Sequence, residues 1–191
     1  MRLRRTTAAV VVGIAVLAGC SNGETANETL PPATPSAAPT SEAPPPLGPT
    51  DFPVPPEARI ESLTGATAFV DYYVTLMDRA QTRLTSEGLR ELSSDCKSCI
   101  VFADGIDSYS SQGYRVEGGG IQLKGASDPV MINRRAEFSI SVQQTMMKVL
   151  DPTGNPVGDL STPDAAYPAS GAAVVWSSTT SSWLMAELTI Q

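Results

Sequence analysis

Apolar side chains recur at steps of three and four residues between positions 66 and 84. They are Ala66, Phe69, Val70, Tyr73, Leu76, Met77, Ala80 and Leu84. An α-helix has 3.6 residues per turn, so this spacing puts them on one face of a helix of about 20 residues. Thr64 is the expected N-cap, and Asp71 and Asp78 fall on the opposite side. The pattern predicts a long amphipathic helix with one buried face.

Two more helices are predicted between residues 86 and 113. A short one over 86–92 would turn Leu89 and Leu92 inward. Asp95 is expected to cap a third helix, and Gly113 is a suitable stop because glycine adopts the left-handed conformation that often ends helices. The predicted inward face of this third helix consists of Cys99, Phe102, Ala103, Ile106 and Tyr109.

The second half of the chain changes to a period of two, which is typical of strands with one buried face. One such strand contains the apolar residues Ala136, Phe138, Ile140 and Val142; another contains Leu184, Ala186, Leu188 and Ile190. Residues 114–124 and 172–177 are also predicted as strands, the first with a bend at glycines 118–120. Residues 151–156 and 178–182 have the composition of turns.

Helices followed by consecutive strands predict an α+β fold, in which N-terminal helices pack on a curved antiparallel sheet. Each half has one strong apolar stripe, and each stripe must cover the other if the domain is to have one core. We therefore expect Phe69, Tyr73, Leu76 and Ala80 to pack on Phe138, Ile140, Leu184 and Leu188. The order βαβ is not predicted anywhere, which disfavours a dinucleotide-binding fold.

The first twenty residues have the layout of a secretory signal. Three arginines in the first five residues precede an apolar run over 8–18, which is shorter than the roughly 20 residues that span a bilayer. The run ends in Leu17-Ala18-Gly19-Cys20, which resembles the bacterial lipobox. That resemblance implies that residues 1–19 are a lipoprotein signal peptide. It also implies that lipid on Cys20 anchors the protein to the cell membrane, outside the cytoplasm.

The segment after Cys20 is rich in Pro, Ala, Thr and Ser. Eleven of the 16 prolines lie between Pro31 and Pro56. Such a composition offers few apolar side chains to bury and cannot offset the entropy of folding. We therefore predict a disordered linker over 20–58 and a folded domain over 59–191.

Composition narrows the possible chemistry. The net charge is −7, and loss of the three N-terminal arginines would make it −10. An acidic domain is repelled by nucleic acid, so nucleic-acid binding is not predicted. The 191 residues include no histidine, which rules out Ser-His-Asp and Cys-His mechanisms within this chain and any zinc site that uses histidine. We predict no catalytic residue, metal or cofactor.

Cys96-Lys97-Ser98-Cys99 is the one cysteine pair outside the signal region. In an oxidising compartment it is expected to form a structural disulfide. The alternative is a thiol–disulfide redox site, since a helix N-terminus lowers the pKa of a thiol. Thioredoxin-like proteins place this motif after a strand in a βαβ pattern, whereas predicted helices precede it here. That context favours the structural disulfide.

The order of predicted elements resembles the cone-shaped fold of the nuclear-transport-factor-two and SnoaL-like superfamily. Residues 59–80, which contain GATAFVDYYVTLMDRA, and the following LRELSSDCKSCI resemble a family of lipoproteins from high-GC Gram-positive bacteria. Members of that family carry a lipobox, a Pro/Thr/Ser-rich stalk and one cone-like domain with a Cys-x-x-Cys. The family has no established activity, so the resemblance implies no catalytic residue.

These features favour a non-enzymatic binding or interaction module. Its partners would be the membrane, through the lipid on Cys20, and a cell-envelope protein or a small ligand. Tyr73, Asp104 and Trp176 are candidate residues of a pocket between the long helix and the sheet. The alternative is an isomerase or cyclase, in which a buried aspartate of raised pKa serves as base beside a tyrosine.

Overall fold

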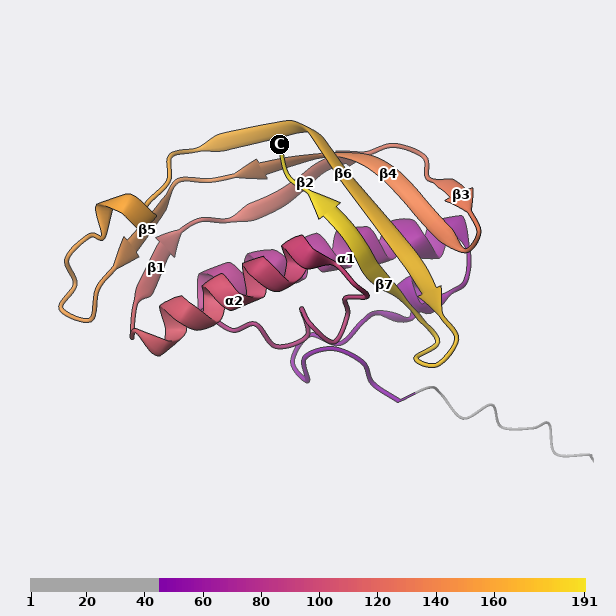
Figure 1. The fold of residues 1–191 in the computed structure, drawn as a ribbon, viewed down its shortest axis with the longest axis horizontal. Coiled ribbons are helices and arrows are strands. Elements are labelled where there is room, and N and C mark those ends of the chain that lie inside the picture. Colours follow the sequence, from indigo (N-terminus) through magenta and orange to yellow (C-terminus); the bar gives the residue numbers. More distant parts are fainter. Residues whose placement is uncertain (1–44) are drawn as a thin grey trace, which may run out of the picture. The chain divides into compact units, whose positions relative to one another are not determined.

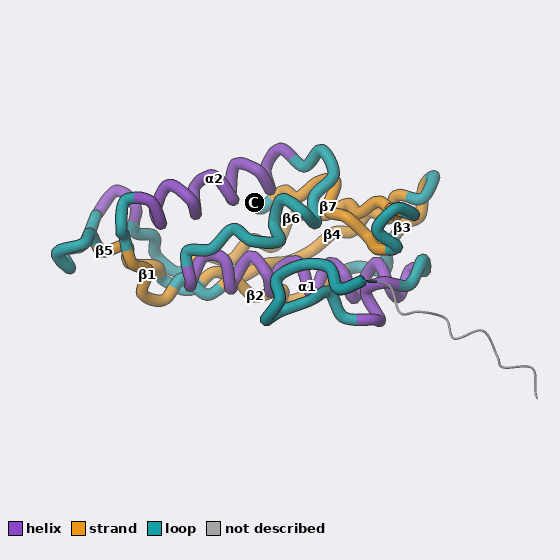
Figure 2. Tube along the Cα trace, turned by 90° about the horizontal axis from the view of Figure 1, so that it is seen from below, coloured by secondary structure: helices purple, strands orange, loops and turns teal. Residues whose placement is uncertain are grey.

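The computed structural model describes residues 45–191, which form an α+β fold. Two α-helices lie on one side of an antiparallel sheet that arches over them (Figure 1). Seen from the helix side, α1 and α2 lie along opposite margins of the domain, with a loop segment between them (Figure 2). In chain order the elements are η1 (Pro56–Arg59), α1 (Leu63–Arg83), α2 (Lys97–Ser111), β1 (Arg115–Gly118), β2 (Ile121–Ala126), β3 (Val130–Ile132), β4 (Arg135–Gln144), β5 (Met147–Leu150), η2 (Gly158–Leu160), β6 (Ala165–Ser177) and β7 (Ser182–Thr189).

Helix α1 is the predicted long helix, and its apolar stripe is buried from Ala66 to Ala80. Its N-cap is Ser62 rather than the predicted Thr64. The Ser62 hydroxyl accepts a hydrogen bond from the Gly65 N–H at 3.0 Å, which satisfies one of the free donors of the first turn. The helix ends at Arg83, and its C-cap Leu84 has a φ of 53°, in the left-handed region.

The segment after α1 forms turns instead of the predicted short helix over 86–92. Gly88 has a φ of +82°, which interrupts helical geometry, and a Cβ there would lie 2.6 Å from the Pro49 ring. Leu89 and Leu92 are nevertheless fully buried, as predicted. Hydrophobic burial here is therefore independent of helix formation.

Helix α2 corresponds to the predicted third helix, with one change at its start. Its N-cap is Cys96, whose sulfur accepts from the Cys99 N–H at 3.3 Å, rather than the predicted Asp95. The predicted stop is confirmed, since the helix ends at Ser111 and Gly113 follows with a φ of +68°.

The larger sheet has the strand order β2-β4-β6-β7, and β3 also pairs with β4. Strands β2 and β3 follow each other along the same edge of β4. The β3–β4 connection is the pair Asn133-Arg134, with φ values of 49° and 63°. Positive φ at both residues is the signature of a type I′ turn, the commonest two-residue hairpin.

A bend divides the predicted strand 114–124 into two. Strand β1 pairs with β5 in a separate two-stranded sheet, whereas β2 pairs with β4. Between them Gly118 and Gly119 have φ values of +72° and +76°, and a Cβ on Gly118 would lie 2.3 Å from the Met146 carbonyl oxygen. The bend at residues 118–120 was predicted, but the change of sheet was not.

Strand β7 corrects the predicted inward face of Leu184, Ala186, Leu188 and Ile190. Trp183 and Met185 are fully buried, and Leu188 is buried too. Ala173 pairs with Glu187 and Val174 with Met185, so Ala186 is an extra residue in the ladder. This β-bulge reverses the alternation, so that odd-numbered residues face the helices before it and even-numbered residues after it.

The two apolar stripes meet in one core, as predicted. Helix α1 packs against β2, β6 and β7. The predicted contact residues Phe69, Tyr73, Leu76, Ala80, Phe138, Ile140 and Leu188 are all buried in that core, and Leu184 packs at its margin.

Residues 47–58 also pack on the domain, so the predicted linker boundary at 58 is wrong for this stretch. Leu47, Val54 and Ala58 are buried in the core. We call residues 47–54 the strap. The predicted signal peptide, Cys20 and the linker up to residue 44 lie outside the described residues.

The strap is held on the outer side of α1 by aromatic and charged contacts. Phe52 stacks on Tyr72 with 4.9 Å between ring centroids, and the Tyr72 hydroxyl donates to the Phe52 carbonyl oxygen at 2.8 Å. The Arg79 guanidinium lies 4.4 Å from the Phe52 ring centroid and 2.6 Å from the Asp51 carboxylate. These contacts explain why a proline-rich segment can be ordered here.

Candidate functional site

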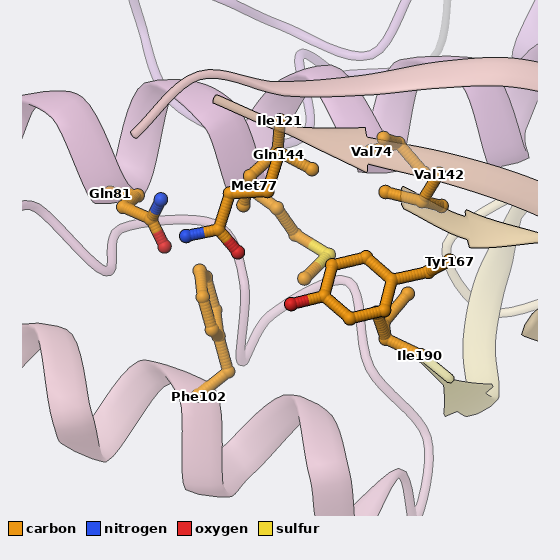
Figure 3. Close-up of a pocket in the computed structure, with 9 residues that line it drawn as sticks. All are labelled: Val74, Met77, Gln81, Phe102, Ile121, Val142, Gln144, Tyr167 and Ile190. Carbon is orange, nitrogen blue, oxygen red and sulfur yellow. The ribbon is translucent and has the colours of Figure 1, made fainter. Parts of the chain in front are cut away.

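A cavity of about 160 Å³ lies at the helix–sheet interface, beside the second half of α1 (Figure 3). Its lining residues come from both helices, from three strands and from the end of the chain. They are Val74, Met77, Gln81, Phe102, Ile121, Val142, Gln144, Tyr167 and Ile190.

Helix periodicity and strand register bring these residues together. Val74, Met77 and Gln81 are three and four residues apart, so they share one face of α1. In the sheet Ile121 is paired with Gln144. Val142 is likewise paired with Tyr167 across β4 and β6. Paired residues point to the same face of a sheet, so all four side chains face the helices.

The cavity has a buried apolar floor and a half-exposed rim. Val74, Met77, Ile121 and Val142 are buried. Phe102 of α2, Gln144, Tyr167 and Ile190 retain solvent exposure and surround the opening. The cavity therefore has an apolar floor and an amphipathic rim.

Gln81 is the buried polar residue of this site, with only 7% of its surface exposed. Its side-chain N–H donates to the Gly119 carbonyl oxygen. Nearby, the Asp78 carboxylate accepts from the Ile121 N–H at 2.8 Å. Because of the bend at 118–120, the Gly119 carbonyl and the Ile121 N–H do not bond to a neighbouring strand. Side chains of α1 provide their hydrogen bonds instead.

Two further polar groups complete the cavity. The Gln144 side-chain N–H donates to the Thr162 hydroxyl at 3.2 Å. Figure 3 shows the amides of Gln81 and Gln144 and the hydroxyl of Tyr167 turned towards the same space, above the ring of Phe102. None of the nine lining residues is charged at neutral pH, and Tyr167 is the single titratable one. The lining can bind uncharged groups, but it has no base that works near neutral pH.

The structure does not bring the three predicted pocket residues together, and none of them lines this cavity. Tyr73 lies in the core, where its hydroxyl contacts the Ser93 hydroxyl at 2.9 Å and donates to the Leu89 carbonyl oxygen at 3.2 Å. Burial raises the pKa of Tyr73 to about 12. Trp176 packs edge-on against Trp183 and lies nine residues from Tyr167 along β6.

Asp104 points to the surface rather than into a pocket. It is one residue past the buried Ala103, and one step along an α-helix is a rotation of about 100°. Its carboxylate pairs with Arg90 at 2.5 Å, and 63% of its side chain is exposed. Arg90 also pairs with Asp107, where a hydrogen bond from Ser86 lowers the pKa of the Asp107 carboxyl. The isomerase hypothesis thus loses the buried base that it requires.

Cys96 and Cys99 form the predicted disulfide. Both residues are at most 2% exposed, so the sulfur atoms are shielded from an attacking thiolate. The Ser98 hydroxyl donates to the Leu188 carbonyl oxygen at 2.6 Å, which fastens the first turn of α2 to β7. This burial favours the structural disulfide over the redox site. Within residues 45–191 no group of three or more acidic or cysteine side chains could hold a metal ion.

Two signals in the sequence bear on the cavity. Gln81 directly follows the apolar Ala80 and lies four residues after Met77, so a polar side chain borders the buried stripe; such a residue must find a partner inside the fold. Tyr167 lies in a part of β6 that was not predicted as a strand, because Pro168 and several alanines obscure the alternation.

Two solved structures show distant likenesses to this chain. No protein-family model and no curated protein matches the chain. The crystal structure of the intermembrane-space region of the chloroplast protein ARC6 is 14% identical, with 68% of this chain and 98% of that chain covered and a TM-score of 0.46. A periplasmic fragment of TraM is 11% identical, with 68% and 97% covered and a TM-score of 0.35. Likenesses of this size carry no functional conclusion. In the part of the chain described here, no helix is long and apolar enough to cross a membrane.

Proposed function

We propose that this chain is an extracytoplasmic lipoprotein whose folded domain is a non-enzymatic binding module. The observation that most supports binding over catalysis is the lining of the cavity, which combines apolar side chains with neutral amides and one phenol. Such a surface holds an uncharged group without acting on it at neutral pH. The buried Cys96–Cys99 disulfide supports the location, because disulfides persist in oxidising compartments outside the cytoplasm.

The proposal includes lipid attachment at Cys20 and membership of the lipoprotein family that residues 59–80 and the segment LRELSSDCKSCI resemble. Residues 20–44 would then tether the domain to the membrane. A diacylglyceryl group brings two acyl chains, and two chains are what stable anchoring requires. The module would meet its ligand or a cell-envelope partner at the outer face of the membrane.

Replacing the lipid-accepting residue tests the anchoring. The Cys20→Ala variant is expected to appear in the medium or to keep its signal peptide uncleaved, whereas the unmodified protein stays with the membrane fraction. Fractionation followed by mass spectrometry of the N-terminus distinguishes these states. Normal processing and continued membrane attachment of Cys20→Ala would show that the lipobox interpretation is wrong.

A complementation experiment tests binding against catalysis in a strain that lacks the gene. Val142→Phe fills the cavity and is expected to abolish function, because a ligand can no longer enter. Tyr167→Phe removes the one titratable group of the lining and should retain function within a few-fold. Val130→Phe changes a valine on β3 that is 60% exposed and serves as the matched control. Loss of function in a folded Tyr167→Phe variant would favour an enzyme instead.

A further inference from the structure

The size of the cavity limits what it can hold. Its volume of about 160 Å³ is well below the roughly 300–1,000 Å³ of pockets for drug-sized ligands. Apolar protein cavities of about 150 Å³ take up benzene or xenon. A single ring or a short branched chain therefore fits, whereas a nucleotide or a sugar chain does not.

The lining excludes a charged ligand. A charge that enters an apolar site loses its hydration and must be paired there. The floor consists of Val74, Met77, Ile121 and Val142, and no lining residue carries a charge at neutral pH. An anion or cation in this cavity would have no partner to compensate for desolvation.

Hydrogen-bonding groups at one side indicate that the ligand also has a polar atom. Gln81 is a buried residue, with 7% of its surface exposed, and its amide faces the cavity (Figure 3). Among the described residues, its one hydrogen bond is donated to the Gly119 carbonyl, so its oxygen and second N–H remain available. The Gln144 amide and the Tyr167 hydroxyl face the same space.

We infer that the cavity binds a small uncharged molecule that has one apolar ring or short branched chain and one hydroxyl or carbonyl group. This inference rests on the proposed binding function and narrows it to a ligand class. The apolar part occupies the floor between α1 and the sheet. The polar atom meets the buried amide of Gln81 and, towards the rim, the amide of Gln144 and the hydroxyl of Tyr167.

Three probes that differ in one group test this ligand class: phenol, benzene and benzoate. The protein is the chain from residue 20 to residue 191 with Cys20→Ala, labelled at its methyl groups and observed by NMR. Phenol is expected to produce saturable shifts of the methyl signals of Val74, Ile121 and Val142. Benzene should bind more weakly, and benzoate should produce no saturable shift at these methyls.

Substitutions separate the polar from the apolar contribution to the binding of these probes. Tyr167→Phe and Gln144→Leu should each weaken phenol binding by about 2- to 10-fold, the value of one neutral hydrogen bond, and leave benzene binding unchanged. Gln81 is left intact in this test because it also holds the bend. Val142→Phe, which fills the floor, and Ile190→Trp, which narrows the rim, should abolish binding of both probes. Val130→Phe on the surface should change neither.

The ligand class would be overturned if phenol caused no saturable methyl shift, or if benzoate bound as tightly as phenol. If phenol does not bind but Val142→Phe still fails to complement, only the ligand class is refuted and the proposed binding function remains supported. Full complementation by Val142→Phe would instead refute the binding function itself.

Discussion

The two halves of α1 cover very different parts of the sheet. The first half carries the buried Phe69, and the buried Trp183 of β7 reaches Ile60 just before the helix begins. Phe138 and Met185 of the sheet are buried in the same core. The second half meets Ile121 and Val142, and the adjoining bend contributes three glycines without side chains. We call these regions the filled end and the hollow end.

The difference shows how one helix–sheet interface can provide both stability and a site. At the filled end the Trp183 indole N–H donates to the Ile60 carbonyl oxygen at 2.8 Å, so even its polar atom is satisfied. At the hollow end Gln81 and Asp78 hold the bend through hydrogen bonds. The cavity has Gln81 on one side and Val142 and Gln144 of β4 on another. Buried, closely packed aromatic side chains contribute strongly to stability, so the fold tolerates an incompletely packed neighbour.

The largest expected effect is the loss of a filled-end aromatic. Trp183→Ala should lower the free energy of unfolding by about 3–5 kcal/mol, because it leaves a large cavity and removes the indole hydrogen bond to the Ile60 carbonyl. Phe102→Ala at the rim of the hollow end should cost only about 1 kcal/mol, since that side chain is partly solvated. Urea denaturation followed by circular dichroism measures both. Equal losses for the two variants would contradict the comparison.

The second effect concerns the bend that creates the hollow end. Gly118→Ala should destabilise the domain by about 2–3 kcal/mol, because the residue needs a positive φ and its Cβ would collide with the Met146 carbonyl. Gly105→Ala is the matched control. No atom lies within 4 Å of a Cβ at Gly105 in α2, so alanine should stabilise the helix by about 0.5–1 kcal/mol. The same denaturation curves decide whether the two substitutions differ in sign.

Alkaline pH offers a third way to probe the filled end. Burial raises the pKa of Tyr73 from 10.0 to about 12, so the folded state holds its proton more tightly than the unfolded state. The contribution to stability is complete below pH 10 and is lost as the pH rises towards 12, a change of about 2–3 kcal/mol. Burial of Tyr72 acts in the same direction.

The Tyr73→Phe variant should therefore lose stability less steeply than the unmodified protein between pH 10 and 12. Its stability at neutral pH is also expected to fall, because Ser93 loses a hydrogen-bond partner. Phe69→Leu, which changes a neighbouring buried residue that does not titrate, should keep the original pH dependence. If Tyr73→Phe leaves the alkaline slope unchanged, Tyr73 is not the group responsible.

The smallest expected change in the free energy of unfolding comes from adding one methylene group at either end, and it compares the packing of the two ends most directly. Val142→Ile adds one methylene group at the hollow end and should raise the free energy of unfolding by up to about 1 kcal/mol. Val174→Ile adds the same group next to the filled end, where Val174 is fully buried, and should instead destabilise by about 1–3 kcal/mol. A stabilised Val174→Ile variant would show that the filled end is less closely packed than its burial indicates.

Several elements could be predicted because their signals are local. The stripe from Ala66 to Ala80 and the alternation over 136–142 repeat often enough to specify a helix and a strand. Gly113, Gly118 and Gly119 mark positions where the backbone has a positive φ. Together these patterns predicted the α+β fold and one core shared by helix and sheet.

Other features depend on contacts between distant residues. The bulge at Ala186 follows from the register of β7 on β6, and it turned Trp183 and Met185 inward against the simple alternation. The strap is ordered because Phe52 meets Tyr72 and Arg79, residues that lie 20 and more positions later. Composition alone could not show that proline-rich residues 47–54 would find these partners.

The candidate site shows the same division. The sequence contains no histidine, which excluded the commonest general base and metal ligand from any site in this chain. The spacing of apolar residues also placed Tyr73 on the buried face of the long helix. Which side chains would share a cavity depended on the angle of α2, the register of β2, β4 and β6, and the bend at 118–120. Those relations arise only when the elements pack, because packing chooses among rotations and registers that are nearly equal in local energy. In the packed structure Asp104 therefore lies at the surface and Trp176 packs against Trp183. Gln81, Gln144 and Tyr167 line one cavity.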